Sequence, residues 1–126
     1  MNVPEELRYS TDHEWVRIDG DRVQVGITDY AQDALGDVVF VQIPELNANV
    51  NIGDTISEVE STKSVSDIYA PVTGQVVEVN TQLDGNPDRI NTDPYGEGWI
   101  FTIKVADASQ LDALLDAEAY RKLTEG

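Results

Sequence analysis

Short stretches of β-branched and aromatic residues, repeatedly interrupted by Gly, Pro, Asn and Asp, most limit how this 126-residue chain can fold. Residues 14–19 and 22–26 predict an opening hairpin with Gly20-Asp21 as its turn. Because strands do not alternate with long helices, the pattern predicts an all-β sandwich or barrel and argues against a doubly wound nucleotide-binding fold. The other predicted strands are residues 37–43, 55–61, 64–69, 75–80 and 99–105.

Helical patterns occur in two segments, which we expect to cover the strands from outside. Residues 28–36 predict a short helix, since Thr28 can cap its first amide groups and Gly36 can adopt the left-handed conformation that ends it. Apolar residues at helical spacing predict a C-terminal helical segment over about residues 109–123, within which Asp116 is placed to cap a second short helix. The length predicts one domain spanning residues 1–126.

The charge balance is strongly acidic, with 24 Asp and Glu against 8 Lys and Arg and a net charge of −16. Nucleic-acid binding and binding to anionic membranes depend on clustered basic residues, so both are disfavoured. No apolar run approaches the ~18–20 residues of a membrane span. The first residues lack the basic region of a signal peptide and the Arg-rich character of a transit peptide. We therefore expect a cytoplasmic protein, with a cleaved organelle presequence left open.

Cysteine is absent, and His13 is the single histidine. The chain therefore cannot form disulfides, zinc ribbons, iron–sulfur ligation, a Cys nucleophile or a multi-His metal site of its own. Redox chemistry at this protein would have to come from an attached or bound group.

Lys63 lies between two predicted strands, in the stretch Ser61-Thr62-Lys63-Ser64, which predicts an exposed turn. The simplest interpretation is an ordinary surface lysine. A Schiff-base nucleophile is disfavoured, because Glu58, Glu60 and Asp67 favour the protonated amine. A third interpretation is covalent attachment of a carrier group through an amide, which needs an exposed tip, small neighbours and rigid β support.

The residues around Lys63 resemble a lipoyl-attachment signature, carried by Gly53, residues 60–63, Asp67-Ile68, Ala70-Pro71 and Gly74. Blocks at residues 10–15, 26–31, 35–41, 91–99 and 114–120 are also similar to the H-protein family of the glycine cleavage system. Biotin carriers flank their lysine with methionines, and lipoyl domains of 2-oxoacid dehydrogenases usually place Asp before it, whereas Thr62 and Ser64 stand here. The resemblance covers residues 7 to 122. It implies a barrel-sandwich hybrid of the lipoyl/biotinyl type, with short peripheral helices and a C-terminal helix.

The resemblance implies a carrier rather than an enzyme, with lipoic acid joined to Lys63 as N6-lipoyl-lysine. The arm would take the aminomethyl group of glycine from the decarboxylase (P protein) to the aminomethyltransferase (T protein). Dihydrolipoyl dehydrogenase (L protein) would then reoxidise it. A lipoate-attaching enzyme is a further implied partner. A lipoyl relay or an acidic docking module without a glycine cleavage role is the alternative function, whereas a small hydrolase lacks a nucleophile–base arrangement.

Further side chains receive roles from the resemblance or from their residue type. Glu14 and Asp67 match family positions near the resting place of the loaded arm and are placed to hydrogen-bond its amine; the alternative is plain surface carboxylates. Some relatives carry histidine where Ala34 stands. His13 is interpreted as a structural or exposed histidine, or else as a pH-sensitive contact. We predict core positions for the large aromatic residues Trp15, Phe40, Trp99 and Phe101.

Overall fold

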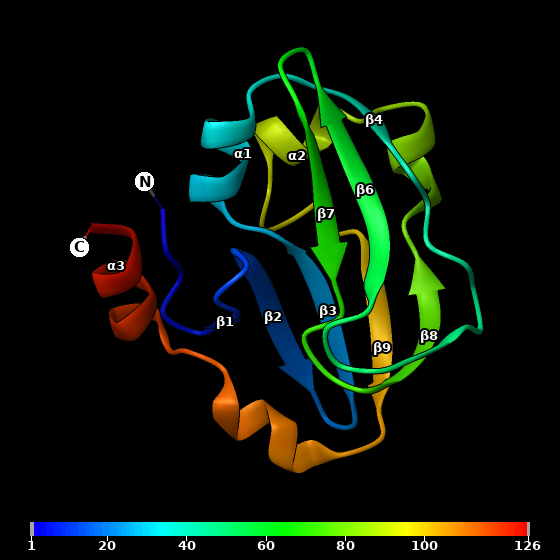
Figure 1. Ribbon diagram of the computed structural model, residues 1–126, viewed down its shortest axis with the longest axis vertical. Helices are drawn as coiled ribbons and strands as arrows, with labels where there is room; N and C mark the ends of the chain where they lie inside the picture. The colour runs from blue at the N-terminus through cyan, green and yellow to red at the C-terminus, as the bar shows by residue number, and fades with distance from the viewer. Residues whose placement is uncertain (1, 126) are drawn as a thin grey trace.

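The computed structural model describes residues 2–125 and contains two antiparallel sheets that face each other (Figure 1). The larger sheet has six strands in the order β1-β2-β3-β9-β8-β5, and the smaller has three in the order β4-β6-β7. The strands are β1 (Arg8–Tyr9), β2 (Glu14–Asp19), β3 (Arg22–Ile27), β4 (Val38–Val41), β5 (Asn49–Val50), β6 (Thr55–Ser61), β7 (Val65–Tyr69), β8 (Gly74–Val79) and β9 (Phe101–Val105). This mostly-β sandwich confirms the predicted fold class.

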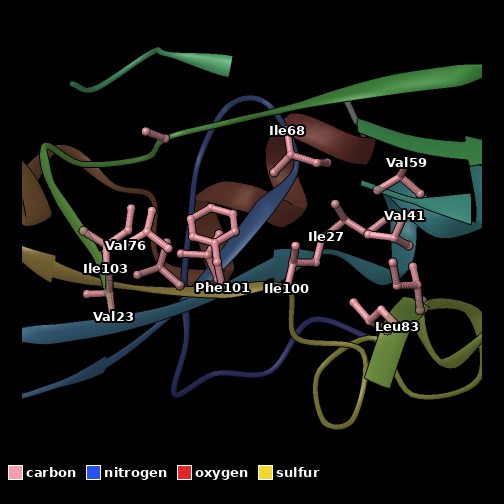
Figure 2. Close-up of a cluster of buried hydrophobic side chains, with 14 of the residues drawn as sticks. Val23, Ile27, Val41, Val59, Ile68, Val76, Leu83, Ile100, Phe101 and Ile103 are labelled. Atoms are coloured by element: carbon pink, nitrogen blue, oxygen red, sulfur yellow. The ribbon is translucent and has the colours of Figure 1, made fainter. Parts of the chain in front are cut away.

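The main core lies between the two sheets, where alternate residues of each strand point inward. The six-stranded sheet contributes fully buried side chains such as Val25 and Phe101, which are direct partners on β3 and β9. The three-stranded sheet contributes Val41 and its partner Val59. Figure 2 shows Phe101, Val41 and Val59 within one cluster of buried apolar side chains that come from both sheets.

A second buried cluster joins the chain ends to the outer side of β2. Trp15 is fully buried there, and its indole Nε1 donates to Pro94 O at 2.8 Å. Gly26, its partner on β3, makes room for the indole, because a Cβ at that position would lie 2.6 Å from Nε1. Tyr9 and Tyr120 stack with ring centroids 4.6 Å apart, which fastens the C-terminal helix to β1.

The predicted helices form at the predicted places. Helix α1 (Asp29–Leu35) is capped by Thr28, whose Oγ1 accepts from Ala31 N, and it ends at Gly36, whose φ is +90°. The C-terminal segment divides, as Asp116 predicts: its Oδ1 accepts from Ala119 N at 2.8 Å in the first turn of the last helix. The remaining helical elements are η1 (Thr81–Asp84), α2 (Arg89–Thr92), η2 (Ala108–Ala113) and α3 (Ala117–Glu125).

The structure corrects the expectation for Phe40, which is 48% exposed. Its neighbour Val41 points into the core with Val59, so alternation turns Phe40 and its partner Glu60 to the outer face of the small sheet. A register shift between Val38 and Phe40 reinforces this change of direction. No helix among residues 2–125 is long and apolar enough to span a bilayer.

Candidate functional site: the lysine hairpin and the adjoining groove

Strands β6 and β7 form a hairpin whose tip stands at one end of the molecule, next to α1 (Figure 1). Glu60 and Val65 are the last paired residues, so Lys63 lies in the connecting loop, as the sequence predicts. The sheet fixes the direction in which the loop projects, because β6 also pairs with β4.

The side chain of Ser61 organises this loop. Its Oγ accepts the backbone N–H groups of Lys63, at 3.1 Å, and Ser64, at 3.0 Å. The backbone of Thr62 donates to Asp37 O at 3.1 Å, which fastens the loop to the segment before β4. Thr62-Lys63 lacks the Gly or Asn of common two-residue turns, so the residue types alone do not explain why the loop is ordered. A hydroxyl oxygen one position earlier satisfies the loop amides instead, which the sequence pattern did not predict.

Lys63 is exposed and forms none of the ion pairs found within residues 2–125. Its alkyl chain lies against Gly36, where an added Cβ would come within 2.9 Å of Lys63 Cε. Asn91 holds this glycine in place, since its Nδ2 donates to Gly36 O and its Oδ1 accepts from Val38 N. From the sequence, Gly36 was predicted only to end a helix and Asn91 had no predicted role, because a contact between segments so far apart in the chain leaves no local pattern.

An open groove of about 240 Å³ adjoins the hairpin. Three segments contribute to its lining: α1, the end of the hairpin loop with the start of β7, and the turn before β2. The mixture of apolar side chains with one carboxylate, on Asp12, fits a flexible apolar chain with a cationic end. The lining residues are Asp12, His13, Tyr30, Ala31, Ala34, Leu35, Ser64 and Ser66.

Glu14 is completely buried and is therefore not a plain surface carboxylate. Its two oxygens accept from Ser10 Oγ at 2.8 Å and from Tyr69 N at 2.7 Å, which ties the turn before β2 to the end of β7. Burial raises the pKa of Glu14 to about 7, although the hydrogen bonds from Tyr69 and Ser10 act in the opposite direction. Glu14 does not line the groove in this conformation.

Asp67 is exposed and pairs with Glu58 across the hairpin. Its neighbour Ser66 shares a face with the buried Val59 and lines the groove, so alternation directs Asp67 to the outer face of the sheet. The structure therefore does not bring Asp67 and Glu14 together at the groove. Contact between either carboxylate and an arm on Lys63 stays a prediction.

An exposed lysine, held at the tip of a sheet hairpin among small hydroxyl residues, defines a carrier protein of the lipoyl/biotinyl type. The family model for the glycine cleavage H-protein matches residues 7–126. The chain belongs to this family, whose members are non-catalytic carriers with lipoic acid on a lysine. As a component of the glycine cleavage system, it has the P, T and L proteins as partners.

Individual relatives match this chain over nearly its full length. The chain is 58% identical to the glycine cleavage system H protein of Mycobacterium avium, with 98% of both chains covered. It is 54% identical to that of Thermus thermophilus, with 99% of this chain and 98% of the relative covered. The crystal structure of the H protein of Mycobacterium marinum has a TM-score of 0.90 at 45% identity, and the match covers 98% of this chain and 100% of that chain.

Proposed function

We propose that Lys63 is the residue to which lipoic acid is attached, and that the groove beside α1 receives the arm while it carries the aminomethyl group. The observation that carries this assignment is the exposure of Lys63 at a hairpin tip, with no ion pair formed by its amine within residues 2–125. The gap above Gly36 leaves space for the alkyl chain. The residues present therefore fit a lipoyl group.

Lipoate, when bound, supplies two sulfur atoms for aminomethyl uptake and thiol–disulfide chemistry to a chain that has no cysteine. The protein holds the attachment point and shelters what it carries. Ala34 and Leu35 give the groove an apolar wall that displaces water, and Asp12 places a negative charge at its end for a cationic amine. Ser64 and Ser66 are small enough to leave the entrance beside Lys63 open.

The order of partners follows the cleavage system. Once a lipoate-attaching enzyme has modified it, Lys63 would present the arm in turn to the P protein, the T protein and the L protein, which would load, unload and reoxidise it. A chain of net charge −16 favours basic partner surfaces over nucleic acids or anionic membranes. We place this cycle in the cytoplasm and assign it to one lipoyl-carrier domain made of both sheets and the C-terminal segment.

The three lysines of the chain give this proposal a matched test. Lys63, Lys104 and Lys122 are all exposed, so each is replaced by Arg in turn. After incubation with a lipoate-attaching enzyme, intact-mass and peptide analysis should show one lipoyl adduct in the wild type and in the Lys104→Arg and Lys122→Arg variants. Lys63→Arg should lose both the adduct and glycine cleavage while its circular dichroism stays unchanged.

Full glycine cleavage by Lys63→Arg would refute the assignment. Deletion of the protein distinguishes the alternative function. Normal glycine cleavage combined with lost lipoylation of other proteins would favour a lipoyl relay, whereas loss of glycine cleavage supports the carrier role.

A further inference from the structure

A network of hydrogen-bonded side chains lies next to the groove and connects three segments. Tyr120, on α3, places its Oη 2.8 Å from His13 Nδ1 and 2.7 Å from Thr28 Oγ1. Thr28 is the N-cap of α1, and its Oγ1 also accepts from Ala31 N at 3.1 Å. The C-terminal helix is thereby joined to α1 and to the turn before β2, both of which line the groove.

Which groups donate and which accept in this hydrogen-bonded network follows from the burial of Thr28, which is completely inaccessible to solvent. Its hydroxyl hydrogen needs an acceptor, and within residues 2–125 the only bonded oxygen available to it is Tyr120 Oη. Thr28 therefore donates to Tyr120, and the hydrogen of Tyr120 is directed to His13. His13 Nδ1 is then an acceptor, so the proton of the neutral imidazole resides on Nε2.

We propose that Tyr120 is a positioning residue that holds His13 as the neutral Nε2–H tautomer, so that the groove presents an uncharged N–H donor to the arm. The part of this inference that concerns the arm rests on the proposed function. A neutral imidazole does not repel a cationic amine, and Asp12 remains the charged side chain that lines the groove. The Nε2–H can donate to an amide oxygen or a sulfur atom of the arm.

The surroundings of His13 agree with a fixed, neutral ring. Its φ of +66° belongs to a tight left-handed turn, and the ring of Tyr30 from α1 lies 4.8 Å away between centroids. Nε2 has no hydrogen-bond partner within residues 2–125, so it is the free nitrogen of the ring. The titratable groups around the ring are Asp12 on its own turn, Tyr30 on α1 and Tyr120 on α3. Burial lowers the pKa of His13, and Asp12 opposes this effect.

Nitrogen-15 NMR of the histidine ring tests the inference in the unmodified protein. Because the chain has one histidine, the ring signals can be assigned to His13 directly. The wild type at pH 8 should show a proton on Nε2 and none on Nδ1. Tyr120→Phe removes only the hydroxyl, and we expect the proton affinity of His13 to rise about fivefold, a pKa shift of ~0.7. The Nδ1–H tautomer should also become detectable in this variant.

Tyr9→Phe is the matched control, because its ring stacks on Tyr120 while its hydroxyl donates to Pro4 O. This variant should leave the tautomer and pKa of His13 unchanged. The hydrogen bond from Tyr120 to His13 can also be tested in the wild type alone, whether or not Tyr120→Phe folds. A slowly exchanging Tyr120 hydroxyl proton should give a nuclear Overhauser effect to the His13 ring.

A wild-type proton on Nδ1, or a titration unaltered by Tyr120→Phe, would overturn the inference. In the lipoylated protein, loading of the arm should shift the Nε2 resonance, and an unshifted resonance would overturn the donor role toward the arm. Failure of Lys63 to accept lipoate would instead overturn the proposed function. The tautomer of the unmodified protein is decided independently of that result.

Discussion

The buried carboxyl of Glu14 predicts a specific dependence of stability on pH. Its pKa of about 7 in the folded protein lies above the ordinary value of 4.5, chiefly because burial disfavours the ionised form. The folded state therefore binds more protons than the unfolded state between these values. The contribution of Glu14 to the free energy of unfolding must therefore fall as the pH rises from 4.5 through 7. The full cost of burying the ionised carboxylate is present only above pH 7.

The magnitude follows from the difference between the two pKa values, which corresponds to a cost of about 3 kcal/mol for the ionised form in the folded state. Between pH 5 and pH 8 the loss amounts to roughly 2–3 kcal/mol. Glu14→Gln has nearly the same shape and no charge. Its amide oxygen can accept from Tyr69 N, which keeps the tie to the end of β7. Ser10 Oγ already accepts from Asp12 N and Glu14 N, so the substitution weakens the tie to Ser10 by an amount that does not depend on pH.

Urea unfolding of both proteins at several pH values measures this cost. The free energy of unfolding of the wild type should fall relative to that of Glu14→Gln by roughly 2–3 kcal/mol from pH 5 to pH 8. Repulsion among the other acidic residues and titration of His13 occur in both proteins, so the difference between them removes these contributions. Glu45→Gln, at an exposed position, is the control for loss of one charge. A difference between wild type and Glu14→Gln that does not vary with pH would refute the reasoning.

Three further perturbations probe the proposed attachment site at Lys63 and the binding of a partner. Ser61→Ala removes the acceptor of two loop amides and should speed hydrogen exchange at Lys63 and Ser64; unchanged exchange would contradict the role of Ser61. Gly36→Ala should cost about 1–3 kcal/mol in urea unfolding and slow lipoylation, because its φ is +90° and its Cβ would meet the Lys63 chain. Gly53→Ala, with a φ of +89° and open space around it, is the control, and equal effects of both would disprove this contact. Binding to the decarboxylase should weaken with added salt, since the chain carries a net charge of −16; calorimetric affinities independent of ionic strength would rule this out.

The features that could be predicted from the sequence are those with local causes. The β2–β3 hairpin follows from period-two alternation around Gly20-Asp21, and α1 follows from Thr28 and Gly36 at its two ends. Asp116 indicated the break in the C-terminal segment for the same reason, because a capping side chain acts within one helical turn. Lys63 stood out since its neighbours along the chain were small and its flanks were strands.

Other features depended on tertiary contacts. Phe40 has the residue type of a core position, but the pairing of Val41 with Val59 turns it outward. The short strand β1 (Arg8–Tyr9) went unpredicted, since two residues carry no periodicity and Tyr9 is held by backbone bonds to Leu115 far along the chain. The burial of Glu14 was missed because charged residues are seldom buried, and its partners at Ser10 and Tyr69 cannot be inferred from spacing.

The proposed attachment point and the groove therefore differ in how the sequence encodes them. Lys63 is presented by a hairpin whose loop bonds involve neighbouring residues, apart from the bond between Thr62 and Asp37. The groove is assembled from three distant segments, and its shape depends on supports such as Asn91 and Tyr120, which do not line it. Since neither Asn91 nor Tyr120 bonds to the loop that carries Lys63, a substitution at either support should leave lipoylation intact and change how well the loaded arm is sheltered. We therefore expect attachment and shelter to be separable by substitution in this fold.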